Sequence, residues 1–263
     1  MTFHRMTMAQ ALVRWLTAQK IETDAGVKPL FPGVFGIFGH GNVTCLAEAL
    51  ERVQDVLPTW RGQNEQGMAL AAIAYAKAKR AEEIMVATSS VGPGATNMVT
   101  SAGVAMANRL PLLILSGDTF ANRRPDPVLQ QVEQFGDPTV TVNDCFKPVT
   151  RYWDRIMHPE QLLKTLPAAV ATMLDPASRG PAFLGIPQDV QATACDYPES
   201  FFAEKIWRIP RRRADESSLK EAADLLTKAK RPLIIAGGGV LYSRAEGALR
   251  AFAQAHGVPV AET

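Results

Sequence analysis

The stretch Val34-Phe-Gly-Ile-Phe-Gly-His-Gly-Asn42 joins a short apolar run to a glycine-rich exit. Residues 34–38 are apolar apart from one glycine, which is typical of a strand buried on both faces. Residues 39–42 predict a turn, and residues 44–53 are expected to form a helix. A buried strand that leads into a helix is the repeating unit of a parallel α/β sheet.

The same alternation recurs along the chain. A capping-box pattern at Thr7 and Gln10 predicts the start of the first helix. Further helices are expected over 64–79, 95–107 and 159–174, and further strands over 84–87, 112–115 and 182–186. The pattern predicts an α/β fold with a mainly parallel sheet.

The composition changes after Asp189, where prolines and scattered charges predict a surface linker over 191–214. Residues 215–263 then open a second α/β unit, with strands expected at 233–236 and 258–260. Two short strands do not close an independent core. The expected organisation is a domain over 1–190, the linker, and the truncated beginning of another domain.

Composition excludes several classes of protein. Apolar residues make up 47% of the 263 residues and charged residues 21%, which excludes intrinsic disorder. Lys and Arg number 28 and Asp and Glu 26, so a net charge of +2 gives no field for nucleic acid or anionic lipid. The three cysteines form no metal or disulfide pattern, and no signal peptide or membrane span is evident. We predict a cytoplasmic protein without nucleic-acid or membrane partners.

Three segments could carry chemistry, and each also has a structural interpretation. His40 and Asn42 follow a strand, where they could simply cap the next helix. Glu65 begins a helix, where a carboxylate ordinarily interacts with the helix dipole. Residues 89–97 form a glycine turn before a helix, a weak candidate for an anion site.

A fourth glycine-rich segment, residues 237–239, follows a predicted strand. A dinucleotide-binding loop would require glycine at the position of Tyr242, so a plain strand-to-helix turn is favoured over a nucleotide-binding regulatory domain.

In combination, the motifs resemble the N-terminal part of the thiamine diphosphate enzymes of the acetolactate synthase and pyruvate decarboxylase type. The shared motifs are residues 34–42, N-E-Q-G-M-A at 64–69, G-P-G-A-T-N at 92–97, P-L-L-I-L-S-G-D at 111–118, Gln130-Gln131, K-P-V-T-R-Y at 147–152 and G-P-A-F-L-G-I-P-Q-D-V at 180–190. The resemblance implies a parallel-sheet, pyrimidine-binding domain followed by the start of a Rossmann-like central domain.

Further motifs favour one branch of this family, which hydrolyses a cyclic diketone to 5-deoxy-glucuronate in myo-inositol catabolism. They are I-F-G-H-G-N at 37–42, S-V-G-P-G-A at 90–95, G-D-T-F-A at 117–121, R-P-D-P-V-L-Q-Q at 124–131 and R-Y-W-D-R at 151–155. The alternatives are a carboligase or decarboxylase of the acetolactate synthase type, or a non-catalytic fragment that needs a complementary diphosphate-binding chain.

The resemblance makes Glu65 the acid that activates the cofactor through the pyrimidine ring. This role requires a protonated carboxyl group, so burial against Met68 and the cofactor is expected to outweigh the opposing helix dipole. His40 is implied as a second catalytic residue, and Asn42 and Gln130 as substrate contacts.

The remaining implied cofactor contacts are Gly41, Asn42, Gly92, Pro93, Gly94 and Asn97. Residues 88–94 are two positions longer than the family's T-S-G-P-G motif, so equivalences over 88–91 stay open. In this family, active sites lie between subunits, which implies at least a homodimer. The Gly-Asp-Gly motif that binds magnesium and the diphosphate is absent. The resemblance therefore covers an N-terminal portion, and the 263 residues alone are expected to be inactive.

Overall fold

The structure is a computed structural model that describes residues 2–124 and 128–263. The chain divides into two compact units, Met1–Ile209 and Pro210–Thr263. The first unit contains every site residue predicted from the sequence.

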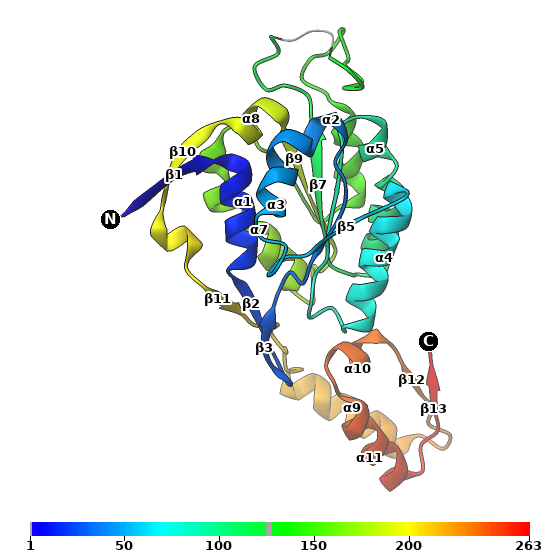
Figure 1. Cartoon of the computed structure of the whole chain (residues 1–263). Coiled ribbons are helices and arrows are strands. Elements are labelled where there is room, and N and C mark those ends of the chain that lie inside the picture. Colours follow the sequence, from blue (N-terminus) through cyan, green and yellow to red (C-terminus); the bar gives the residue numbers. More distant parts are fainter. Residues whose placement is uncertain (1, 125–127) are drawn as a thin grey trace. The chain divides into compact units, whose positions relative to one another are not determined.

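A six-stranded sheet, parallel throughout, forms the centre of the first unit (Figure 1). Its order is β5 (Thr59–Arg61), β4 (Val34–Ile37), β6 (Val86–Ser89), β7 (Leu112–Asp118), β9 (Pro181–Pro187) and β8 (Tyr152–Arg155). Every residue of β6, β7 and β9 is buried. The predicted parallel α/β fold is confirmed.

Helices cover both faces of this sheet, which explains why its central strands are continuously apolar. One face is covered by α1 (Met8–Thr17), α3 (Glu48–Glu51) and α7 (Leu162–Leu174), whose side chains form a core cluster with Val86, Leu113 and Leu184. The other face is covered by α4 (Glu65–Ala78), α6 (Val99–Ala107) and the 3₁₀-helix η2 (Val142–Val149).

The first helix begins where its capping box predicts. The Thr7 hydroxyl accepts a hydrogen bond from the Gln10 backbone at 3.3 Å, and the Gln10 side chain accepts one from the Thr7 backbone at 3.1 Å. By contrast, the expected turn at 39–42 is helical. It forms α2 (Gly39–Asn42), which continues through the π-helix η1 (Val43–Ala47) into α3.

Residues 191–214, predicted as a linker, contain two strands that pair with the first unit. β10 (Ala194–Pro198) lies antiparallel to β1 (Phe3–Thr7), and β11 (Lys205–Trp207) lies parallel to β2 (Gln19–Thr23), which also pairs with β3 (Gly26–Pro29). The rings of Tyr197 and Phe202 enter the core cluster, which explains why this segment packs on the unit. The remaining short helices described in this unit are α5 (Pro93–Thr96), η3 (Pro159–Gln161), α8 (Gln188–Ala192) and η4 (Glu199–Phe202).

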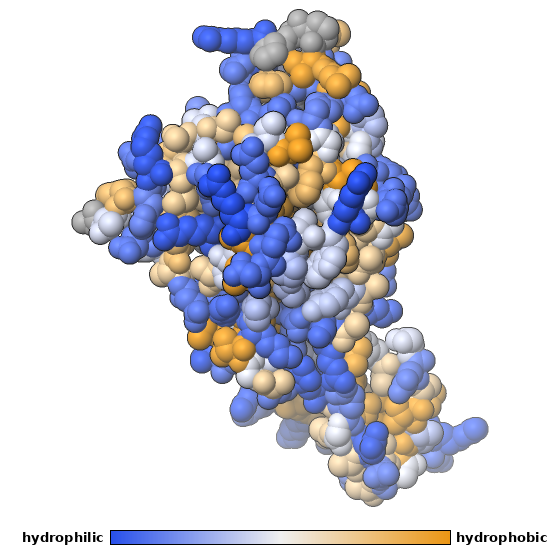
Figure 2. All heavy atoms as spheres, viewed as in Figure 1, coloured by the Kyte–Doolittle hydropathy of each residue, from blue (hydrophilic) through white to orange (hydrophobic). Residues whose placement is uncertain are grey.

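The second unit has two parallel strands, β12 (Ile234–Ala236) and β13 (Val260–Glu262), with α9 (Glu216–Lys228), α10 (Gly238–Tyr242) and α11 (Glu246–His256). No residue of these three helices is buried. Apolar side chains therefore gather on the surface of this unit (Figure 2). Within the part of the chain that the structure describes, no helix has the length and apolar character needed to cross a membrane.

Candidate functional site

The predicted site residues come from loops at one edge of the sheet. Parallel strands end at the same edge, which is where open α/β sheets bind ligands. His40 follows β4, Glu65 follows β5, and residues 92–97 follow β6. Figure 1 shows α2, α5 and α8 at this end of the sheet.

Glu65 is the first residue of α4 and faces the loop after β6. The helix is capped by Asn64, whose side-chain oxygen accepts a hydrogen bond from the Gly67 backbone at 2.9 Å. Oε2 of Glu65 accepts a hydrogen bond from Nδ2 of Asn97 at 2.8 Å. A Cβ at Gly94 would lie 3.3 Å from Oε1 of Glu65. Glycine at this position leaves room beside the carboxyl group.

A shallow, open pocket of about 440 Å³ surrounds this carboxyl group. It is lined by Glu65, Pro93, Gly94, Thr96 and Asn97. The structure thus brings together four of the predicted residues. Met68 is buried, whereas Glu65 itself is only half-buried, so the expected burial of the Glu65 carboxyl group against Met68 and the cofactor stays a prediction.

The glycines around His40 allow two loops to approach closely. A Cβ at Gly39, which has a φ of +51°, would lie 2.6 Å from Cβ of Ser90, and one at Gly41 would lie 3.1 Å from the Val91 backbone nitrogen. His40 is half-buried, and its Nε2 atom is enclosed without a hydrogen-bond partner among the described residues.

Asn42 is completely buried, and its side chain is engaged inside the chain. Nδ2 donates to Oγ1 of Thr88 at 3.1 Å and to the Ser89 carbonyl at 2.6 Å. Oδ1 accepts a hydrogen bond from Nε2 of Gln191 at 3.0 Å. Because both ends of the amide are occupied, the geometry favours a structural role for Asn42 over contact with a substrate.

Gln130 lies in the connection after β7, and among the described residues no hydrogen bond joins it to Glu65. Its side chain is exposed, but its backbone carbonyl packs against Gly92. A Cβ at Gly92 would lie 1.8 Å from that carbonyl oxygen, and the φ of Gly92 is +74°. This position therefore requires glycine, and it joins the loop after β6 to the loop after β7.

A buried charge cluster at the same edge was not predicted from the sequence. Arg155 donates hydrogen bonds from Nε to Asp118 at 2.8 Å and from Nη2 to Asp144 at 2.7 Å and Thr141 at 2.6 Å. Burial tends to raise the pKa of Asp144, but hydrogen bonds from Lys147, the Thr141 backbone and Arg155 outweigh it and lower this pKa to about 2. The only signal in the sequence was the position of Asp118 just after a predicted strand, because β8, which ends at Arg155, was not predicted.

Two family models match the chain. The N-terminal TPP binding domain of thiamine pyrophosphate enzymes matches residues 6–137, and the central domain of these enzymes matches residues 219–263. The chain belongs to the thiamine pyrophosphate enzyme family. Within the described part of this family member, no three metal-ligating side chains are grouped to hold an ion.

Two similar proteins of the thiamine pyrophosphate enzyme family carry the same name. The chain is 50% identical to the 3D-(3,5/4)-trihydroxycyclohexane-1,2-dione hydrolase of Geobacillus thermodenitrificans and 49% identical to that of Shouchella clausii. Both matches cover 259 residues, or 98% of this chain, but 40% and 41% of the relatives. The chain therefore spans about 40% of the length of the curated relatives it matches.

Proposed function

We propose that the chain forms the pyrimidine side of the active site in a thiamine diphosphate-dependent hydrolase. The substrate would be 3D-(3,5/4)-trihydroxycyclohexane-1,2-dione, and ring opening would yield 5-deoxy-glucuronate. The observation that carries the proposal is the Glu65 carboxyl group, held by Asn97 beside the space left at Gly94. The 50% identity to a hydrolase of this name supports the choice of substrate.

The residues around this pocket fit the pyrimidine end of the cofactor. Asn97 occupies Oε2 of Glu65, so Oε1 is the oxygen that can hold a proton and donate a hydrogen bond to a ring nitrogen. When bound, thiamine diphosphate supplies a carbon nucleophile and an electron sink for cleavage of a carbon–carbon bond. The net reaction would consume one water molecule and convert the cyclic dione into the open-chain acid 5-deoxy-glucuronate.

His40 is proposed as the residue that moves a proton at the substrate. The His40 side chain is half-buried, and its enclosed Nε2 atom has no hydrogen-bond partner among the described residues, so a turn of the ring would present this nitrogen to a substrate hydroxyl without breaking an existing hydrogen bond. For Gln130, a role at the substrate requires its exposed side chain to turn towards the pocket. Gly41, Gly92 and Pro93 would shape the cofactor wall.

The rest of the site is proposed to come from a diphosphate-binding domain that carries magnesium. In that arrangement the 263 residues alone are inactive, and the working enzyme is at least a cytoplasmic homodimer. No residue grouping in the described part of this chain offers the metal ligands, which supports placing them elsewhere.

The decisive experiment is to assay the full-length protein encoded by the gene with thiamine diphosphate and Mg²⁺. We expect hydrolysis of the cyclic dione and no acetolactate from pyruvate. Acetolactate formation without dione hydrolysis would favour the carboligase alternative. Turnover that requires a second, diphosphate-binding chain would favour the alternative of a non-catalytic fragment.

A further inference from the structure

The connection between β7 and η2 is long. It spans residues 119–141, and its described parts, 119–124 and 128–141, contain neither helix nor strand. Long irregular connections are uncommon in compact domains and usually have a function. This one carries Gln130, so the way in which it is held affects the site.

The Arg155 side chain contacts both ends of this loop. Asp118 is the last residue of β7, where the loop begins, and Oδ2 of this residue accepts a hydrogen bond from Nε of Arg155. Thr141 lies where the loop ends, and its hydroxyl accepts a hydrogen bond from Nη2 of the same guanidinium group. The planar fork of arginine suits such a two-sided contact, which lysine would not reproduce.

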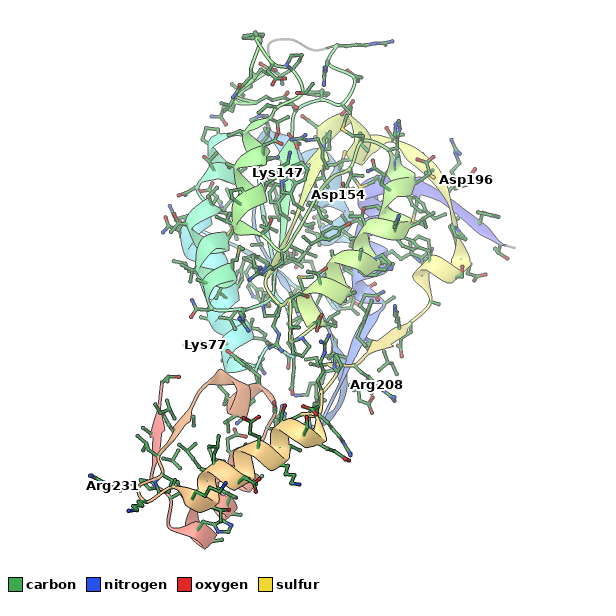
Figure 3. All side chains as sticks on the ribbon, turned by 180° about the vertical axis from the view of Figure 1, so that it is seen from behind. Lys77, Lys147, Asp154, Asp196, Arg208 and Arg231 are labelled. Atoms are coloured by element: carbon green, nitrogen blue, oxygen red, sulfur yellow. The ribbon has the colours of Figure 1, made fainter. Side chains whose placement is uncertain are left out.

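The ion pair between Arg155 and Asp118 is buried, and the neighbouring strand leaves room for it. The Asp118 side chain is fully buried, and the Arg155 side chain is 16% exposed. On the neighbouring strand, a Cβ at Gly185 would lie 2.6 Å from Oδ2 of Asp118, so glycine makes room for the carboxylate. Asn143 also donates a hydrogen bond to the Gly117 carbonyl at 2.8 Å, which ties η2 to the end of β7. Figure 3 shows Lys147 on η2 and Asp154 on β8, the elements that meet here.

We propose that Arg155 is a positioning residue that closes the base of the loop over residues 119–141 and thereby holds the Gln130 carbonyl against Gly92. Gly92 directly precedes Pro93 and Gly94, which line the pocket at Glu65. The contact of the Gln130 carbonyl with Gly92 therefore sets where the loop meets the pocket. The consequence for substrate binding rests on the function proposed above, whereas the closure of the loop does not.

The test requires a variant that opens the loop without leaving a buried charge. Arg155→Met alone would strand the Asp118 carboxylate, which can unfold the domain. The double variant Arg155→Met/Asp118→Asn removes both charges. The matched control is Lys147→Met. Lys147 also forms an ion pair with Asp144, at 2.5 Å, but no ion pair joins it to Asp118 among the described residues.

The first measurement is limited trypsin cleavage of the full-length protein after Arg123, an exposed loop residue. Cleavage within residues 211–213, which are exposed outside the first unit, serves as the internal reference. We expect the ratio of the cleavage rate after Arg123 to the cleavage rate within residues 211–213 to rise about tenfold in the double variant. In Lys147→Met this ratio should stay at the parent value. A parent-like ratio in the double variant would overturn the proposal.

The second measurement separates positioning from a merely structural role. We expect the double variant to raise KM for the cyclic dione about tenfold, with a smaller change in kcat. Faster cleavage with a parent-like KM would overturn the positioning role. If the parent protein does not hydrolyse the dione, the proposed function fails, and the cleavage ratio still decides whether Arg155 closes the loop.

Discussion

Asn97 donates a hydrogen bond from Nδ2 to Oε2 of Glu65 across 2.8 Å. The two residues belong to the segments that follow β6 and β5, so the contact joins two loops at the carboxyl edge of the sheet. It also orients the carboxyl group, because one oxygen is held while the other faces the space at Gly94. The orientation of Glu65 is thus set by the chain itself.

Glu65→Gln should preserve the fold and abolish most of the activity. The glutamine oxygen can still accept the hydrogen bond from Asn97, so the free energy of unfolding should change by less than about 0.5 kcal/mol. Turnover of the dione by the full-length protein should fall at least about a hundredfold, since glutamine has no carboxyl proton to supply. The control is Glu51→Gln, at an exposed position. Retained turnover in Glu65→Gln would refute the role of Glu65.

Asn42→Ala should reduce stability. The substitution deprives the buried Thr88 and Gln191 side chains of a partner, which costs about 1–3 kcal/mol. Asn108→Ala, at an exposed helix end, should cost less than about 0.5 kcal/mol in the same urea titration. A normal stability together with a raised KM would instead identify Asn42 as a substrate contact.

Gly92→Ala should displace the loop that carries Gln130. The new Cβ would meet the Gln130 carbonyl, and the positive φ adds backbone strain, so the loss of stability should exceed about 1 kcal/mol. Gly26→Ala is the matched control, because Gly26 also has a positive φ but no atom within 4 Å of the added Cβ. The Tm should fall further, and KM for the dione should rise further, in Gly92→Ala than in Gly26→Ala. Equal effects of the two substitutions would mean that backbone strain alone matters.

Asp144 should make stability depend on pH in the acid range. Its pKa is about 2 in the folded protein against an ordinary value of 3.8. The ionised form is therefore favoured on folding, and the stabilisation of roughly 2 kcal/mol is complete well above pH 4 and lost as the pH falls towards 2. Urea unfolding should show that the difference in free energy of unfolding between the parent and Asp144→Asn becomes about half as large when the pH is lowered from 7 to 3. A constant gap would contradict the assignment, and Asp55→Asn, at an exposed position, is the control.

The central sheet was predictable because its inner strands are buried on both faces. Such strands appear in the sequence as uninterrupted apolar runs, as in β7 and β9. Edge and outer strands lack this signal. Each residue of β8 is only half-buried, and β10 alternates between exposed and covered positions. Their place depends on pairing with distant strands, which no local pattern encodes.

The site was predictable only in part for a similar reason. Glycine-rich turns and a helix-starting glutamate are local features, so Glu65, Gly94 and Asn97 could be proposed from their motifs. The engagement of Asn42 by Gln191 and the bridge from Arg155 to Asp118 join residues far apart in the sequence. Both contacts exist because parallel strands bring their ends to a common edge.

The position of β9 between β7 and β8 has a consequence for biosynthesis. β8 precedes β9 in the chain, yet within the described residues it pairs with β9 alone, and β9 also pairs with the outer edge of β7. A nascent chain on the ribosome that has not reached residue 187 therefore leaves one edge of the apolar strand β7 unpaired. Exposed strand edges promote association between chains. Ribosomal pausing over 156–180 would prolong this exposure, and the same intermediate is the form that a chaperone would bind.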